Sequence, residues 1–381
     1  MYELTEEQKL LQDTLRRLAR EHVAPRAAEI DARAEYPQDM FELLRDQGLF
    51  ALPFPEEYGG TGSVLTACLA IEELSRICYN TAYLLVVQWV PFAAVHAAGS
   101  EEQKARLLPA LAAGEIRMAL AVTESGAGSD VGGLKTRASA CDGGYAISGS
   151  KIFCTNAAVA DFVITAARTS PGAGSRGISL FLVPTDAPGF ACVRNESKLG
   201  GRGVPSSELR YDDVRVSEAD RLGDENDGFK RVMAAFNHSR PIIGARGVGL
   251  AQGAMDLAAN YARERQAFGQ PIGGFQGLRW IIADMAIQIE AARHLVYRAA
   301  AVIDREGTGK GSAAIAAMAK CFATDVAMKV AVDAVQVYGA AGISKDLPIE
   351  RFMRDAKLLQ IVEGTNQIQR NIVADTVLGR F

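Results

Sequence analysis

The chain has 381 residues, of which 49% are hydrophobic and 23% charged, and its formal net charge is −4 at pH 7. This length allows two or three domains with a sizeable core, and a slightly acidic chain without a run of basic residues argues against nucleic acid as a partner. The six cysteines and four histidines are scattered, without C-x-x-C or H-E-x-x-H spacing, which argues against a disulfide framework and against a metal site.

The first predicted domain, residues 1–115, is helical. Its N-terminus is acidic and lacks an apolar core, so no signal peptide is predicted, and residues 5–8 have the form of a capping box. The apolar run 82–98 is broken by Gln88 and Pro91 and is too short to span a bilayer. We therefore expect no membrane insertion and a cytoplasmic location.

The second predicted domain, residues 116–224, contains short β-rich runs separated by turn signals, which is typical of a small antiparallel β domain or barrel. The runs are 118–123, 136–141, 145–148, 151–155, 162–167, 178–184 and 209–216. The small-residue loop 123–130 lets a backbone approach a ligand closely, although a plain hairpin connection has the same composition. On the strand that ends at Thr155, Phe153 is either a core residue or a ring that stacks on a flat ligand.

The third predicted domain, residues 225–381, returns to long helices. Apolar stripes run through 250–261 and 278–299, and further helices are predicted through 312–337 and 366–378. Helices of this length with short connections favour an antiparallel four-helix bundle, placed after the segment Asn237 to Arg240. The fold class is therefore α+β, mostly α.

A carboxylate near the C-terminus is the candidate general base. Residues 354–362 read as a helix, and Gly364 is a natural helix stop, which places Glu363 at the negative end of the helix dipole. Apolar neighbours predict partial burial and a raised pKa, both suited to a base. A surface glutamate at a frayed helix end is the alternative from this segment alone.

Taken together, the spacing of several segments resembles the acyl-CoA dehydrogenase family over essentially the whole chain. The segments are 123–130, 265–272, 275–276, 354–356 and 363–370. The resemblance implies a helical domain, a β-barrel and a four-helix bundle, with FAD bound non-covalently. It also implies α,β-dehydrogenation of an acyl-CoA thioester to the trans-2-enoyl-CoA, electron-transfer flavoprotein as acceptor, a place in fatty acid metabolism, and a homotetramer.

The resemblance assigns roles to individual residues. It assigns the flavin to Leu120, Val122, Thr123, Gly128, Ser129, Phe153 and Thr155 of the β domain. It assigns the adenine-diphosphate half, across a subunit interface, to Arg265, Phe268, Gln276, Gln336 and Gly339, with Thr365 and Gln367 completing the site. It assigns acyl-CoA contacts to Ser129, Asn237, His238, Ser239, Arg240 and Gly364.

The same resemblance implies that Glu363 accepts the α-proton while hydride passes to flavin N5. Some relatives carry the base at the position of Ser239, and a serine offers no carboxylate there. Two alternatives stay open: a flavin oxidase or monooxygenase that uses O2 on the same fold, and a non-catalytic protein that binds acyl-CoA or a partner. The sequence leaves acyl chain length, branching and pathway undetermined.

Overall fold

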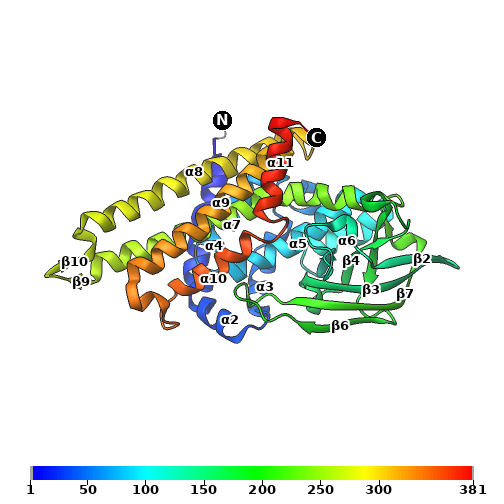
Figure 1. Ribbon diagram of the computed structural model, residues 1–381, viewed down its shortest axis with the longest axis horizontal. Helices are drawn as coiled ribbons and strands as arrows, with labels where there is room; N and C mark the ends of the chain where they lie inside the picture. The colour runs from blue at the N-terminus through cyan, green and yellow to red at the C-terminus, as the bar shows by residue number, and fades with distance from the viewer. Residues whose placement is uncertain (1–2, 380–381) are drawn as a thin grey trace.

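The computed structural model describes residues 3–379. Figure 1 shows N-terminal helices in blue and cyan, a sheet in green at one end, and long helices in yellow to red that extend to the other end. The predicted fold class, a helical region followed by a β region and a helical bundle, is confirmed.

The N-terminal region is built from helices whose starts follow from capping residues. Thr5 and Ser100 each form a capping box with the glutamine three residues later. The helices are α1 (Glu6–Leu18), α2 (Ala27–Arg33), α3 (Gln38–Asp46), α4 (Val64–Ser75), α5 (Tyr79–Ala98) and α6 (Glu101–Ala112).

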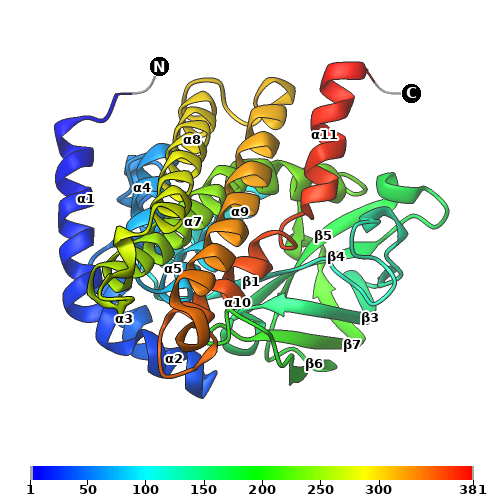
Figure 2. The ribbon, with the colours of Figure 1, turned by 60° about the vertical axis from the view of Figure 1, so that its left-hand side comes forward.

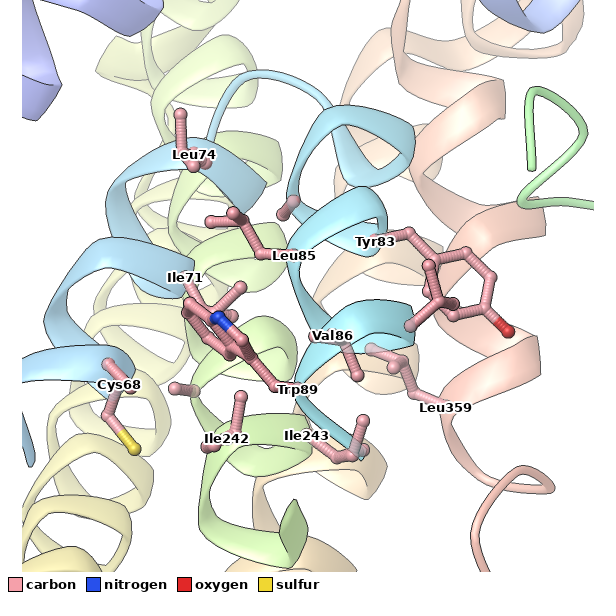
Figure 3. Close-up of a cluster of buried hydrophobic side chains, with 14 of the residues drawn as sticks. Cys68, Ile71, Leu74, Tyr83, Leu85, Val86, Trp89, Ile242, Ile243 and Leu359 are labelled. Atoms are coloured by element: carbon pink, nitrogen blue, oxygen red, sulfur yellow. The ribbon is translucent and has the colours of Figure 1, made fainter. Parts of the chain in front are cut away.

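Helix α5 forms the centre of the core. Figure 3 shows Trp89 of α5 beside Ile71 of α4 and close to Ile242 of α7, and its indole Nε1 donates to the Phe50 carbonyl at 2.9 Å. Among the described residues, α5 is the one helix long and apolar enough to cross a membrane. The prediction that the run was too short is wrong, because the helix begins at Tyr79 and has 20 residues. Most of it is buried inside the protein, as in the core helix of a globular domain.

The middle region is a single sheet with strand order β6-β7-β3-β2-β4-β5-β8, with β1 paired to β4. The strands are β1 (Met118–Ala121), β2 (Arg137–Cys141), β3 (Gly144–Thr155), β4 (Phe162–Arg168), β5 (Ile178–Pro184), β6 (Phe190–Asn195), β7 (Ser206–Ser217) and β8 (Arg221–Leu222). Pairing is antiparallel except where β4 meets β1 and β2. Strand β6 was not predicted.

Two predicted strands are joined in β3. Gly149 connects them with a φ of +148°, and a Cβ atom there would lie 2.6 Å from the hydroxyl of Thr136, which directly precedes β2. The register of β3 against β7 shifts around Gly149 and again between Lys151 and Cys154. Irregularities of this kind bend a strand and redirect its side chains, and the second shift contains Phe153.

The C-terminal region consists of α7 (Gly228–Glu264), α8 (Gln276–Glu306), α9 (Lys310–Tyr338), α10 (Ile349–Leu359) and α11 (Asn366–Leu378). Figure 2 shows α7, α8 and α9 side by side, with α11 rising beside them. A small hairpin, β9 (Gln266–Ala267) and β10 (Gln270–Pro271), joins α7 to α8.

The start of α7 differs from the prediction. The segment Asn237 to Arg240 was expected to precede the helix, but α7 begins at Gly228 and includes Pro241. The segment therefore lies on a rigid helix that is buried over most of its middle part.

Candidate active site around Glu363

Glu363 lies in the turn between α10 and α11. Helix α10 ends at Leu359, so the prediction of a helix through residue 362 is wrong and Glu363 is not at the end of a helix dipole. Its backbone is left-handed, with φ +53°, and Gly364 follows with φ +89°. A residue other than glycine keeps this conformation only where its surroundings enforce it, which is frequent at functional sites.

Contacts from α9 and α11 enforce the turn. Lys320 of α9 is fully buried, and its Nζ donates to the Gly364 carbonyl and to Asn366 Oδ1, each at 2.9 Å. Gln369 Nε2 donates to the same Gly364 carbonyl at 2.9 Å, and Asn366 Nδ2 donates to Asp325 Oδ1 at 2.8 Å. The turn that carries Glu363 is thus fixed at the Gly364 carbonyl and at Asn366, the first residue of α11.

The Glu363 carboxylate points toward α7, where the Ser239 hydroxyl donates to Glu363 Oε2. Burial raises the pKa of Glu363, while the Ser239 hydrogen bond and the positive charges of Arg246, Lys320 and Arg240 lower it. The net direction of the pKa shift is upward and burial is its main cause, both as the apolar neighbours in the sequence predict, whereas the predicted position at the end of a helix dipole is wrong. A carboxylate whose pKa is raised in this way is suited to act as a general base.

Two side chains of the predicted α7 segment, those of Ser239 and Arg240, act on the Glu363 carboxylate. Arg240 is buried and donates from Nη1 to Asn237 Oδ1, and its Nε has no partner among the described residues. Burial lowers the pKa of Arg240, and the negative charge of Glu363 raises it. Burial also lowers the pKa of His238 to about 4, which keeps that imidazole neutral.

A second group of predicted residues lies at the end of β3. Phe153 is 56% exposed with φ +52°, so it is not a core residue, whereas Cys154 beside it is buried. The Thr155 hydroxyl lies 2.9 Å from the Ser206 hydroxyl. Beside this strand, a Cβ atom on Gly126 or Gly128 would meet nothing within 4 Å. An exposed ring, a hydroxyl and an open glycine loop suit a flat aromatic ligand.

This glycine loop is anchored by a buried ion pair that sequence reasoning missed. Lys151 Nζ donates to Glu124 Oε1 at 2.8 Å and to the Val122 carbonyl at 3.0 Å. Glu124 also accepts from the amides of Lys135 and Thr136. A charged residue inside an apolar strand was the available signal. The remaining predicted residues of this region are Leu120, Val122 and Thr123, which lie just before Glu124 of the ion pair in the chain, and Ser129, which is exposed in the glycine loop.

The other predicted cofactor residues lie far from this group. Phe268 of the β9-β10 connection is 96% exposed with φ +51°, and Arg265 and Gln276 beside it are exposed. Gln336 and Gly339, at the end of α9, are exposed as well. Figure 1 places the β9-β10 hairpin at the end of the molecule opposite the sheet, so the predicted FAD residues form two separate groups in one chain.

Two predicted residues begin α11, close to Glu363. The Thr365 hydroxyl accepts from the Ile368 amide at 3.3 Å and caps the helix, while the Gln367 side chain is exposed. Sequence reasoning missed Lys320 and Arg246, both fully buried. The signal that could have found them is a cation inside an otherwise apolar helical stretch.

Three family models match the chain consecutively. They are described as the acyl-CoA dehydrogenase N-terminal domain, matching residues 5–115, the middle domain, matching residues 119–214, and the C-terminal domain, matching residues 226–378.

Individual proteins match over their full length. The cyclohexane-1-carbonyl-CoA dehydrogenase of Geobacter metallireducens is 45% identical, with 99% of each chain covered. A chain in the structure described as the electron transferring flavoprotein of Acidaminococcus fermentans is 39% identical, with a TM-score of 0.96 and 100% of each chain covered. The butyryl-CoA dehydrogenase of Megasphaera elsdenii is 36% identical, with a TM-score of 0.95 and coverage of 99% of this chain and 100% of that one.

Proposed function

Because the chain belongs to the acyl-CoA dehydrogenase family and is an oxidoreductase acting on CH–CH bonds, we propose that it converts an acyl-CoA thioester to its trans-2-enoyl-CoA with Glu363 as the base. The observation that carries this proposal is the half-buried carboxylate of Glu363, whose pKa is raised by burial and which accepts a hydrogen bond from Ser239 of α7, in a turn that Lys320 of α9 holds at the Gly364 carbonyl.

The base works through its fixed position. The α-proton of a thioester is weakly acidic, so a carboxylate with a raised pKa is the better acceptor. Ser239 donates to Glu363 Oε2, and among the described residues no hydrogen bond reaches Oε1. Within residues 3–379, no acceptor takes the Glu363 amide N–H. This amide is a preorganised donor for the enolate oxygen that develops as the proton leaves.

We propose FAD as the cofactor, and the residues present fit it. Phe153 and Thr155 would hold the flavin ring, with Leu120, Val122, Thr123, Gly128 and Ser129 around it. Arg265, a good partner for a diphosphate, would act with Phe268, Gln276, Gln336 and Gly339 on the adenine-diphosphate half. When bound, FAD supplies the acceptor for the β-hydrogen as hydride. Thr365 and Gln367 would complete the site, and Ser129, Asn237, His238, Ser239, Arg240 and Gly364 would contact the acyl-CoA.

The separation of the two FAD groups supports a homo-oligomer, for which we propose a tetramer. One chain carries the groups at opposite ends, so a second copy must supply the adenine-side residues. Large apolar side chains are exposed in the β9-β10 connection and along α8 and α9, which is typical of a covered interface. They include Phe268, Trp280, Ile287, Phe322 and Val332.

We propose a division of labour among three domains: residues 1–115 as a helical domain, 116–224 for flavin and substrate, and 225–381 for the base and for assembly. Electron-transfer flavoprotein is the proposed acceptor, supported by the description of the Acidaminococcus structure. A cytoplasmic location fits these partners. Rapid reoxidation of reduced flavin by air, with peroxide formed, would favour the oxidase alternative instead.

Anaerobic bleaching of the flavin by acyl-CoA thioesters tests the proposed base. We expect Glu363→Gln to keep bound FAD and to lose bleaching, because an amide cannot accept the α-proton. Glu115→Gln, an exposed glutamate remote in sequence, is the matched control and should bleach normally. Near-normal turnover of Glu363→Gln would refute the assignment. A purified protein that cannot take up FAD would refute the function itself.

A further inference from the structure

Arg246 of α7 is a buried cation without a hydrogen-bond acceptor. It is 0% exposed, and Nε, Nη1 and Nη2 all lack a partner among the described residues. A guanidinium stays charged in proteins, and burying an unpaired charge is costly. Nearly all buried polar groups in folded proteins have partners, so the three unpaired nitrogens require an explanation.

Two tyrosines of α5 hold the guanidinium by its faces. Arg246 Cζ lies 3.7 Å from the ring centroid of Tyr79 and 3.8 Å from that of Tyr83. Aromatic faces attract a cation and fix the plane of the guanidinium, but they accept none of the N–H groups at its edge. Among the described residues the buried Tyr79 hydroxyl has no partner of regular hydrogen-bond geometry; burial raises its pKa, and the adjacent Arg246 guanidinium lowers it. The two rings therefore hold the guanidinium in place, while none of its three nitrogens makes a hydrogen bond of regular geometry to a described residue.

The cluster of Arg246, Tyr79 and Tyr83 lies further along α7 from the base. Arg246 follows Ser239 by seven residues, about two helical turns on the same face and roughly 10 Å along the axis. Ser239 contacts Glu363, and the Arg246 charge also acts on Glu363. Figure 3 shows Tyr83 on the side of α5 that faces Leu359 of α10, away from Trp89. An acyl chain that starts at Glu363 and follows α7 brings its far end to Arg246.

Positive charge exceeds negative charge around this path. Three buried cations, Arg246, Lys320 and Arg240, lower the pKa of Glu363 through their charge. Lys198 lies near the cluster as well: burial and the Arg246 charge lower its pKa to about 8, and Asp355 opposes them. The Asp355 carboxylate already accepts from the Gly201 amide at 2.7 Å. A surplus of buried cations favours an anionic ligand.

We infer that Arg246 binds a carboxylate at the far end of the acyl chain, so that the preferred substrate is the CoA thioester of a dicarboxylic acid. A carboxylate matches the guanidinium fork in a bidentate pair and supplies the missing acceptors. A methyl-terminated chain leaves the fork unpaired, and a site built to hydrogen-bond a group discriminates against analogues that lack it. The inference rests on the proposed function, because it takes Glu363 as the place where the acyl chain begins.

Matched pairs of thioesters test the inference on the FAD-loaded enzyme. The pairs are glutaryl- and pentanoyl-CoA, adipyl- and hexanoyl-CoA, and pimelyl- and heptanoyl-CoA. In at least one pair we expect kcat/KM for flavin bleaching to favour the dicarboxylic member by tenfold or more. Arg246→Met should abolish this preference, mainly through KM, and Arg246→Lys should restore part of it. Arg117→Met is the matched control, because that arginine stacks 4.0 Å from the Phe41 ring centroid in the N-terminal region; it should leave the preference unchanged.

Binding without turnover gives a second readout. Titration of the flavin spectrum of Glu363→Gln with the same thioesters should show a lower Kd for the dicarboxylic members, and adding Arg246→Met should remove the difference. A wild type without a dicarboxylic preference in any pair overturns the inference, and so does a dicarboxylic preference that Arg246→Met leaves unchanged. If Arg246→Met does not fold, the wild-type panel and the Glu363→Gln titration decide. If no thioester bleaches the wild-type flavin, the proposed function fails, and the titration alone then judges the carboxylate preference.

Discussion

The hydrogen bond from Ser239 to Glu363 predicts how the rate of proton removal depends on pH. Ser239 is buried at 3% exposure, and its hydroxyl donates to Glu363 Oε2. A hydrogen bond to a charged group contributes roughly 1.5–3 kcal/mol, and this one favours the ionised carboxylate. Ser239→Ala should therefore raise the pKa of Glu363. Since about 1.4 kcal/mol is a factor of ten, the ionised fraction on the acid side should fall about tenfold or more.

Stopped-flow reduction of the flavin under anaerobic conditions, measured across pH, is the assay. Ser239→Ala should be about tenfold slower than wild type on the acid limb of the profile and equal to it on the alkaline plateau, where both enzymes are ionised. Ser239→Thr keeps the hydroxyl and should follow the wild type. A uniform loss at every pH would refute the reasoning, because it would mean that Ser239 positions the base without tuning its pKa. An unchanged profile would refute it as well.

Three further perturbations probe the same turn and the flavin group. Lys320→Met removes two hydrogen bonds to the turn, so the free energy of unfolding in urea should fall by about 1–3 kcal/mol, whereas Lys329→Met, which breaks an exposed ion pair, should change it by less than about 1 kcal/mol. Burial raises the pKa of Glu363 above its ordinary 4.5. The contribution of this carboxyl group to stability is therefore full below pH 4.5 and is lost as the pH rises through the pKa of the folded state. Glu363→Gln should thus melt at a higher temperature than the wild type at pH 8 and at the same temperature near pH 4. Phe153→Gly relieves a left-handed backbone and removes an exposed ring, so the protein should fold normally but lose FAD more readily on dialysis, while Val193→Ala on β6 should retain it.

Periodicity and turn signals predicted most of the fold, and the failures have local causes. The two runs within β3 read as separate strands because Gly149 resembles a turn residue. In the sheet, Gly149 is required because a side chain there would meet Thr136, the residue before the neighbouring strand β2. Asn237 to Arg240 reads as a loop because Pro241 follows, yet α7 continues through that proline. In both cases tertiary packing overrides the local preference.

The candidate site divides in the same way. Glu363, its partial burial and its raised pKa can be predicted from the segment that follows it and from its apolar neighbours, but the elements that surround it, α7 and α9, cannot. The partner Ser239 is 124 positions away in the chain. Arg246 is unpaired because, among the described residues, no acceptor on the neighbouring helices reaches its nitrogens in regular hydrogen-bond geometry. The lack of such an acceptor in the fold leaves no pattern in the sequence.

The placement of Phe153 and Arg265 at opposite ends of one chain has a genetic consequence. In an assembly where each cofactor site combines the β domain of one copy with the hairpin end of another, a variant at either residue disables every site of its own homo-oligomer. Co-assembly of the two variants leaves one site of each mixed pair with both defects and its counterpart with none. Random mixing in pairs then restores about a quarter of the sites, so two inactive proteins become partly active together.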